Sequence, residues 1–296
     1  MPNRKKSLNQ IGVHIALIVL CCFIIYPFLM LVSVSLSSEA DIAYTGYKLI
    51  PPKLDFSAYE YVLANPSAII QAYKTTATFS IIGTLLGTLF MAMCAYPLSK
   101  KNFRPRKYLN FYLYFTMLFG GGLVPSYILI TRYLHLDDTI WVYIFPSLIS
   151  VWHLFMMRTF FSNLPSEMFE SVLVDGGNEF LIFFRFVIPL SKPVIATVAL
   201  MTFLSKWNDW NTSMLYVNDS RLHSLQYLLQ EMLKKIELLQ NAETTSLVGS
   251  MVDSAEIPAE TARMAMAVIV AGPALIVFPF FQKYFVKGLT VGSVKG

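Results

Sequence analysis

The sequence predicts an all-α integral membrane protein with about six transmembrane helices, formed by a single transmembrane domain over residues 1–296. Hydrophobic residues make up 55% of the chain and charged residues only 14%, against about 25% charged in a typical soluble domain. A soluble fold of this length needs more polar residues to cover its surface. Apolar stretches also recur near the roughly 20 residues that an α-helix needs to cross hydrocarbon.

Six apolar stretches account for the predicted helices, and the first is long enough to be a true span. It holds 23 residues, whereas the apolar core of a signal peptide holds about 7–15. We therefore expect an uncleaved first helix after the basic residues at positions 4–6. The fourth stretch is short, and the fifth contains Lys206 and Asp209. In order, the stretches are Ile11–Ser33, Thr75–Leu98, Asn110–Ile130, Ile140–Met157, Pro193–Val217 and Met264–Phe281.

The distribution of Lys and Arg predicts the orientation. With the N-terminus inside, the inner side holds 14 basic and 4 acidic residues and the outer side 8 basic and 13 acidic, leaving Lys206 and Asp209 within a stretch. Cytoplasmic loops carry the excess of Lys and Arg. We therefore expect cytoplasmic termini, a cytoplasmic loop at 164–193, and extracellular loops at 34–74 and 218–263. The net charge of +5 reflects this topology and predicts no nucleic-acid partner.

Several chemistries have no counterpart in the sequence. It contains no G-x-x-x-x-G-K-[ST] phosphate loop and no constellation typical of a hydrolase or metalloprotease. Its three cysteines lie within apolar stretches, without metal-ligand spacing. We therefore expect no enzymatic activity, no cofactor and no metal site, and we expect any energy from ATP to come from another subunit.

The loop at 164–193 is polar, and its first part predicts a short helix. Pro165 suits a first helical turn, where its missing N–H leaves no bond unmade. We expect this helix to run to about Val174. The sequence Asp175-Gly176-Gly177 then ends it, because glycine adopts the left-handed conformation of a helix C-cap at little cost.

A second helix is predicted directly after the glycines. Asn178 is a favourable N-cap, and Glu179 lies in the first turn. Pro189 and Pro193 are expected to end this helix and begin the next span. Its apolar face, at positions i, i+3, i+4 and i+7, would consist of Phe180, Phe183, Phe184 and Val187. The pattern suits either a docking element or an amphipathic helix that anchors the loop at the membrane surface.

These motifs resemble the permease subunits of binding-protein-dependent ABC sugar importers. The spacing of Glu170, Gly176 and Pro189 is similar to the EAA loop of that family, although Ser171-Val172 stands where the family has Ala-Ala. The other resemblances are Leu190-Ser191-Lys192-Pro193, Trp207-Asn208-Asp209-Trp210 and the tail from Gln282 to Gly296. The subgroup indicated is the smaller, maltose-permease-like subunit of importers for complex oligosaccharides.

The resemblance implies a type I ABC importer permease fold in a bacterial cell membrane. It implies a second homologous permease, an ATPase subunit dimer and an extracellular or periplasmic solute-binding protein as partners, besides membrane lipid, and an oligosaccharide as substrate. The residues expected to couple the permease to the ATPase are Glu170, Asp175, Gly176, Gly177 and Pro189.

The fifth stretch is too polar for a helix that faces lipid, because unpaired polar groups are costly in hydrocarbon. Its candidates for the substrate path are Trp207, Asn208, Asp209, Trp210 and Asn211, and His153 of the fourth stretch joins them. The tryptophans, three positions apart, would share one helix face and stack on sugar rings. Alternatively, they form an interfacial belt, Lys206 and Asp209 form a structural ion pair, and His153 is a packed histidine.

Residues 222–241 predict an amphipathic helix on the outer side, either meeting the solute-binding protein or lying on the membrane. An ion-coupled secondary transporter is the alternative function. It would show inverted repeats and intramembrane carboxylates, whereas no internal repeat is visible and Asp209 is the only acidic residue in a stretch.

Overall fold

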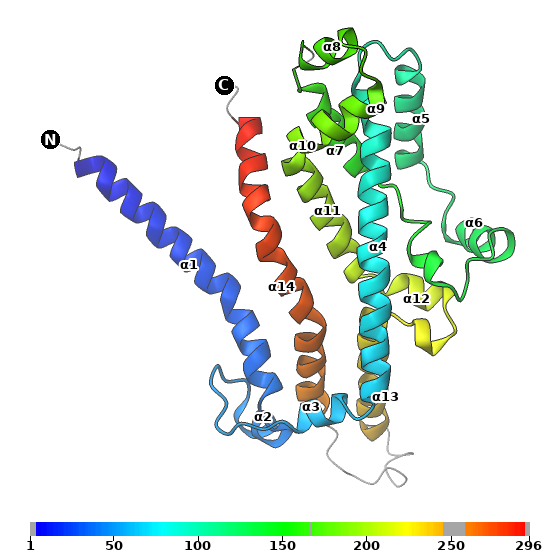
Figure 1. Cartoon of the computed structure of the whole chain (residues 1–296). Coiled ribbons are helices and arrows are strands. Elements are labelled where there is room, and N and C mark those ends of the chain that lie inside the picture. Colours follow the sequence, from blue (N-terminus) through cyan, green and yellow to red (C-terminus); the bar gives the residue numbers. More distant parts are fainter. Residues whose placement is uncertain (1–3, 166, 245–257, 294–296) are drawn as a thin grey trace. The chain divides into compact units, whose positions relative to one another are not determined.

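The computed structural model describes residues 4–165, 167–244 and 258–293, and these ranges contain helices and turns without a strand (Figure 1). Three helices are each long and apolar enough to cross a membrane, namely α1 (Arg4–Ser35), α4 (Pro66–Ser99) and α14 (Ala259–Ser293). Two bent helix pairs raise the number of candidate spans to five if each pair counts as one. The predicted all-α membrane class is therefore confirmed.

The first bent pair occupies the third apolar stretch. Helix α5 (Arg106–Leu118) and the segment made of α6 (Leu123–Ile128) and the π-helix η1 (Leu129–Tyr133) meet at 109°. The turn between them contains three successive glycines, of which Gly122 has a φ of +87°. Such a φ is available to glycine without steric cost, which explains why the chain reverses direction here.

The fourth stretch is not the continuous helix that its composition predicts. The structure has a 3₁₀-helix η2 (Ile140–Tyr143), an irregular segment, and then α7 (Val151–Ser162). Pro146 lies in the irregular segment, where it disfavours a helical conformation of the preceding residue. Ser150 provides the N-cap of α7, since its hydroxyl accepts a hydrogen bond from the backbone N–H of His153 at 3.5 Å.

The chain forms two compact units, and the first comprises the described residues of 1–66 and 229–272. It contains α1, α2 (Glu39–Thr45), α3 (Ser57–Val62), most of α13 (Leu225–Thr244) and the beginning of α14. The Glu39 carboxylate accepts hydrogen bonds from the backbone N–H groups of Glu260 and Thr261, both at 3.0 Å. An anion at this position satisfies unpaired N–H groups at the start of α14 and complements its dipole.

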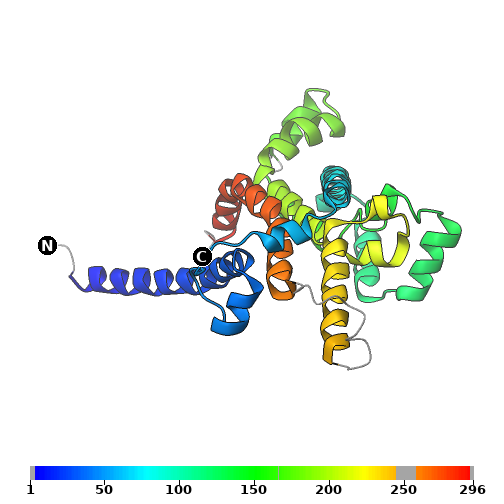
Figure 2. The same ribbon diagram turned by 90° about the horizontal axis from the view of Figure 1, so that it is seen from below.

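The second unit comprises the described residues of 67–228 and 273–296. Its main core packs α4 against α7, the segment 182–187 and α11 (Lys192–Trp207), with Met91, Met157 and Val198 at its centre. Figure 1 shows α11 beside α4. Figure 2 views α4 almost along its axis and again shows α11 next to it.

Two glycines of α4 allow this close packing. A Cβ atom at Gly83 would lie 2.6 Å from Cε of Lys206, and one at Gly87 would lie 2.8 Å from the carbonyl oxygen of Leu148. Both distances are shorter than van der Waals contact, so the neighbours occupy space that any other residue would fill. The helix α4 therefore has a groove for a lysine side chain at one position and for a backbone carbonyl one turn later.

Candidate functional site

The loop at 164–193 folds into the helix–turn–helix that its sequence predicts. Helix α8 (Glu167–Val174) ends at two glycines, and α9 (Glu179–Ile182) follows. Gly176 has a φ of +81°, and the backbone N–H of Gly177 donates to the carbonyl of Val172 at 2.8 Å. Asn178 is the N-cap of α9, because its side chain accepts a hydrogen bond from the N–H of Leu181 at 2.8 Å.

The two glycines are needed for different reasons. Gly176 adopts a backbone conformation that side-chain-bearing residues rarely adopt, although the space around it is open. Gly177 has an ordinary φ, but a Cβ atom there would lie 2.5 Å from Cγ1 of Val172. The turn therefore sets the direction of α8 through backbone conformation at one residue and through close approach at the next.

Helix α8 has an inner and an outer side. Phe169 and Val172 pack against the main core of the unit. Glu170 is exposed, and Val174, on the side away from Phe169 and Val172, is apolar yet 87% exposed; Leu173, next to Phe169 on the helix surface, is 43% exposed. A short helix that is fixed by one side and presents apolar and acidic groups on the other is a surface on which a partner protein can dock.

The four residues of the predicted apolar face of the second helix are not equally exposed. Phe183 and Val187 are buried, as is Ile182, whereas Phe180 and Phe184 are 68% and 52% exposed. A π-helical turn, η3 (Phe183–Val187), follows α9 directly, and its wider spacing of residues differs from the α-helical spacing assumed for this face. Pro189 lies at the start of α10 (Ile188–Leu190), so the helical segment continues past it and ends at Leu190.

Glu179 connects the loop to the C-terminal end of α4. Its carboxylate accepts a hydrogen bond from the Tyr96 hydroxyl at 2.6 Å and forms an ion pair with Lys100. Partial burial would raise the pKa of Glu179, but the hydrogen bonds from Lys100 and Tyr96 outweigh it and hold this pKa below its usual value. The carboxylate is therefore charged at neutral pH, and it joins α9 to α4.

An open cavity of about 680 Å³ lies between α8 and the basic loop after α4. Glu170 and Glu179 contribute to its walls, as do the basic residues Lys100, Lys101 and Arg106. Three of the five positive charges between Ser99 and Tyr108 thus lie beside the loop at 164–193, and the charge distribution predicts that both segments are on the same side of the membrane.

The fifth apolar stretch is interrupted in its middle. Helix α11 ends at Trp207, and α12 (Asn211–Tyr216) begins after three intervening residues. The Asp209 carboxylate accepts hydrogen bonds from the backbone N–H and the hydroxyl of Thr212, at 3.0 and 2.6 Å. The Asn208 side chain accepts one from Gln226 at 2.8 Å and donates one to the carbonyl of Leu204. These polar residues therefore stabilise a break between two helices.

Most of the predicted path residues meet at one cavity of about 470 Å³. His153 of α7 also lies in the wall of this cavity. The candidates from the fourth and the fifth apolar stretches are therefore brought together. The predicted residues that line this cavity are His153, Asn208, Asp209, Trp210 and Asn211. Four small hydroxyl residues also line the cavity, namely Ser147, Ser150, Thr202 and Ser205. They could not be predicted, because such residues form no distinctive pattern in the sequence.

Trp207 is the exception among the predicted path residues. It is only 4% exposed and packs against Phe203 and Tyr73, with ring centroids 5.7 and 6.4 Å apart. Trp210 is 36% exposed and lines the cavity. The expectation that both tryptophans share one helix face is wrong, because α11 ends at Trp207 and the helical spacing does not extend to Trp210.

The alternative ion pair between Lys206 and Asp209 is not formed either. The Lys206 ammonium donates to the carbonyl of Tyr143 at 2.9 Å and to the hydroxyl of Ser147 at 2.8 Å. Within the described ranges, no carboxylate lies in ion-pairing distance of this ammonium. Lys206 therefore extends along the groove at Gly83, while the Asp209 carboxylate accepts hydrogen bonds at the start of α12.

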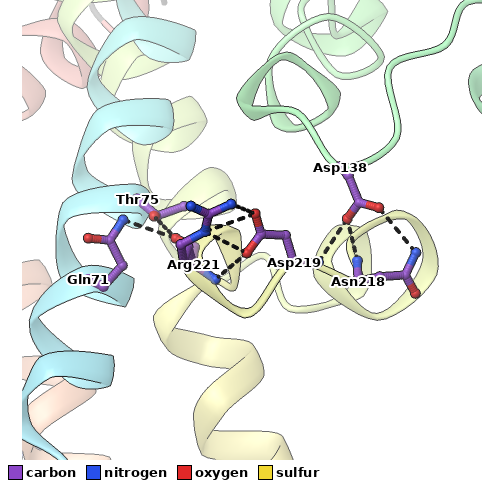
Figure 3. A network of polar contacts seen from close by, with 6 residues as sticks. All are labelled: Gln71, Thr75, Asp138, Asn218, Asp219 and Arg221. Carbon is purple, nitrogen blue, oxygen red and sulfur yellow. Dashed lines mark hydrogen bonds and ion pairs between the residues drawn. The ribbon is translucent and has the colours of Figure 1, made fainter.

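A polar network fixes the chain that follows α12 (Figure 3). Asp138 accepts hydrogen bonds from the backbone N–H groups of Asn218 and Asp219, at 2.5 and 2.9 Å, and these bonds lower the pKa of its carboxyl. The carbonyl of Arg221 accepts bonds from Gln71 and Thr75 of α4, at 3.0 and 3.1 Å. The segment 217–222 is thereby attached both to the turn before η2 and to α4.

Buried hydroxyls extend this network to the helix break. The Tyr143 hydroxyl lies 2.6 Å from that of Ser213, which donates to Ser224 at 3.0 Å. Ser224 in turn donates to the carbonyl of Asp209 at 2.7 Å. Groups buried in this way are costly unless they are paired, so this chain of bonds specifies the position of the break.

Comparison with known proteins gives a consistent picture. Residues 83–291 match the family described as "Binding-protein-dependent transport system inner membrane component". Protein LplC of Bacillus subtilis (strain 168) is 36% identical over 92% of this chain and 90% of its own length. The polygalacturonan/rhamnogalacturonan transport system permease protein YtcP of the same organism is 32% identical over 100% of both chains.

A solved structure also resembles the chain. It is the crystal structure of a bacterial ABC transporter involved in the import of the acidic polysaccharide alginate, and its matching chain has a TM-score of 0.79 at 28% identity. The match covers 96% of this chain and 99% of that one. With the helix–turn–helix loop and the interrupted fifth stretch in place, these matches show that the chain belongs to the family of inner-membrane permease components of binding-protein-dependent ABC transport systems.

Proposed function

We propose that this chain is one of two homologous permease subunits of an importer that uses ATP to move an oligosaccharide into a bacterial cell. The observation that supports this most is helix α8, which is held from its inner side and leaves Glu170, Leu173 and Val174 exposed. YtcP is described as a permease of a polygalacturonan/rhamnogalacturonan transport system, and the solved structure is that of a transporter involved in the import of the acidic polysaccharide alginate. The ATP would be hydrolysed by a separate pair of ATPase subunits.

In this proposal, the loop at 164–193 couples the permease to the ATPase. Glu170 would meet polar groups of the ATPase, while Asp175, Gly176 and Gly177 set the direction in which α8 projects. Pro189 lies in the helical segment that leads to α11. Because Glu179 is bound to Tyr96 and Lys100, a displacement of the loop would be passed to α4 and, through the main core, to the cavity side of α11.

We further infer a single transmembrane domain with six spans and both termini in the cytoplasm. The three long helices and two bent pairs provide five spans, and residues 140–162, with α7 at their end, would provide the sixth. The charge distribution of 14 basic residues on one side against 8 on the other supports this orientation. The outer segment 218–263, which includes α13, would then meet the solute-binding protein.

The substrate path would run past the cavity at the helix break. Asn208, Asp209, Trp210, Asn211 and His153 line it, and Trp207 supports the path from behind through its packing against Phe203 and Tyr73. Amide, carboxylate and aromatic groups are well suited to the hydroxyls and apolar faces of sugar rings. The position of these groups at a helix break agrees with the rule that irregular membrane backbone lines cavities or is buried in protein.

Uptake by the reconstituted complex tests this function. The permease pair, the ATPase and the binding protein are placed in vesicles, and accumulation of a labelled oligosaccharide is measured with ATP and with a non-hydrolysable analogue. We expect uptake only with ATP and only with the binding protein. Uptake that follows an imposed proton or sodium gradient without ATP would contradict the proposal.

A further inference from the structure

The Lys206 side chain is a charged group buried within a membrane segment. It is 4% exposed, and its ammonium has three N–H donors, of which two are used by Tyr143 and Ser147. No carboxylate in the described part of the chain neutralises it. Burial of an ion without a counter-charge is costly, and ionisable groups in such segments commonly serve function.

The position of this ammonium is built into the fold. Gly83 leaves room for the end of the lysine side chain, since a Cβ atom there would lie 2.6 to 2.9 Å from its Cε, Cδ and Nζ. The nearest acidic residue in sequence, Asp209, directs its carboxylate oxygens to Thr212 instead. The chain thus keeps a lysine at the wall of the 470 Å³ cavity without a direct ion pair in the described ranges.

Unpartnered polar atoms occur in the same wall. The Thr202 hydroxyl is buried without a hydrogen-bond partner in the described structure, and the residue is 6% exposed. Nδ1 of His153 also lacks a partner there. Both residues line the cavity together with Lys206. A buried polar group without a partner is costly, and a ligand that supplies the missing hydrogen bond offsets this cost.

We propose that Lys206 binds a carboxylate of the transported sugar, with the Thr202 hydroxyl and the His153 imidazole binding adjacent sugar hydroxyls, so that this permease prefers acidic, uronate-containing oligosaccharides. The proposal rests on the proposed function and specifies its substrate class. A cavity of this volume lies within the range of small-molecule sites. The cavity wall combines this ammonium with hydroxyl, amide and aromatic groups and with the Asp209 carboxylate, whose oxygens accept hydrogen bonds from Thr212. The ammonium is complementary to the carboxylate of a uronate ring, and the neutral polar groups are complementary to its hydroxyls.

The test compares labelled trigalacturonate with its fully methyl-esterified form, in which each carboxylate is replaced by an uncharged methyl ester. Uptake of each is measured with the complete importer in vesicles, so that selection by the binding protein is the same for every variant. We expect Lys206→Met to lower trigalacturonate uptake about tenfold or more and to lower uptake of the ester much less. Lys74→Met, which removes an exposed lysine of α4, is the matched control and should change neither.

Thr202→Val separates a ligand role from a structural one. Replacing an unpartnered buried hydroxyl by a methyl group should leave thermal stability unchanged or raise it, so lower uptake by a stable Thr202→Val protein supports the proposal. Equal uptake of trigalacturonate by the wild type and Lys206→Met, or an equal loss for both probes, would overturn the carboxylate site and leave sugar import intact. A wild-type complex that transports neither probe nor any neutral oligosaccharide would overturn the proposed function itself.

Discussion

Replacing Gly176 by valine is expected to uncouple ATP hydrolysis from uptake while the permease remains folded in the membrane. Gly176 has a φ of +81° and open space around it, so the substitution introduces backbone strain without a steric clash. A β-branched residue in the left-handed region costs about 1–2 kcal/mol or more. The turn would relax to another conformation, and α8 would project in another direction.

The size of this effect follows from the strain. One to two kcal/mol corresponds to about a 5–30-fold change in an equilibrium, so the fraction of complexes with α8 correctly presented should fall by this factor. Uptake and ATP hydrolysis are measured on the same vesicles, and their ratio should fall accordingly. Gly176→Asn is the matched control, because asparagine tolerates the left-handed conformation better than other residues, and it should retain most coupling. Full transport by Gly176→Val at normal expression would contradict the role of this turn.

The second large effect is expected at Gly83, where alanine should destabilise the second unit. Its Cβ atom would lie 2.6 Å from Cε of Lys206, and this lysine cannot move away without losing its bonds to Tyr143 and Ser147. Overpacking and the loss of charged hydrogen bonds together should cost about 3 kcal/mol. Thermal unfolding of the purified protein in detergent measures this loss.

Two controls distinguish this mechanism from a general effect of alanine in a helix. Gly12→Ala in α1 meets no atom within 4 Å and should be neutral or slightly stabilising, because alanine is the better helix former. In a Lys206→Ala background, Gly83→Ala should cost little, because the clashing side chain is absent. An equal loss of stability in both backgrounds would show that the groove at Gly83 serves another contact.

The loop at 164–193 was predictable because its signals are local. Glycine at a left-handed turn and asparagine as an N-cap depend on neighbouring residues only, and the structure shows both. The expected helix start at Pro165 is not seen, since this residue lies before α8 (Glu167–Val174) and outside it. The π-helical turn at Phe183–Val187 was not predictable, since the spacing of apolar residues suits an α-helix equally well.

The fifth stretch shows the limit of composition. Its polarity correctly indicated a cavity, but hydropathy does not reveal that α11 ends at Trp207. That break depends on distant partners, because Ser224 and Gln226 hold Asp209 and Asn208 in place. The same holds for Lys206, whose partners Tyr143 and Ser147 lie about 60 residues away in sequence. Spacing alone suggested Asp209 as its partner, and the fold provides a carbonyl and a hydroxyl instead.

Cross-linking from α8 to the ATPase tests the central claim most directly. Single cysteines are placed on the outer side, at Glu170 and Val174, and on the inner side, at Val172, which packs against the core. Cys21, Cys22 and Cys94 are first replaced, so that each variant has one thiol. In the assembled importer, a short bifunctional reagent should link the outer cysteines to the ATPase subunit and leave the inner one unreacted. Links of equal yield from Val172 and Val174, or no link from Glu170 or Val174, would contradict the docking of α8 on the ATPase.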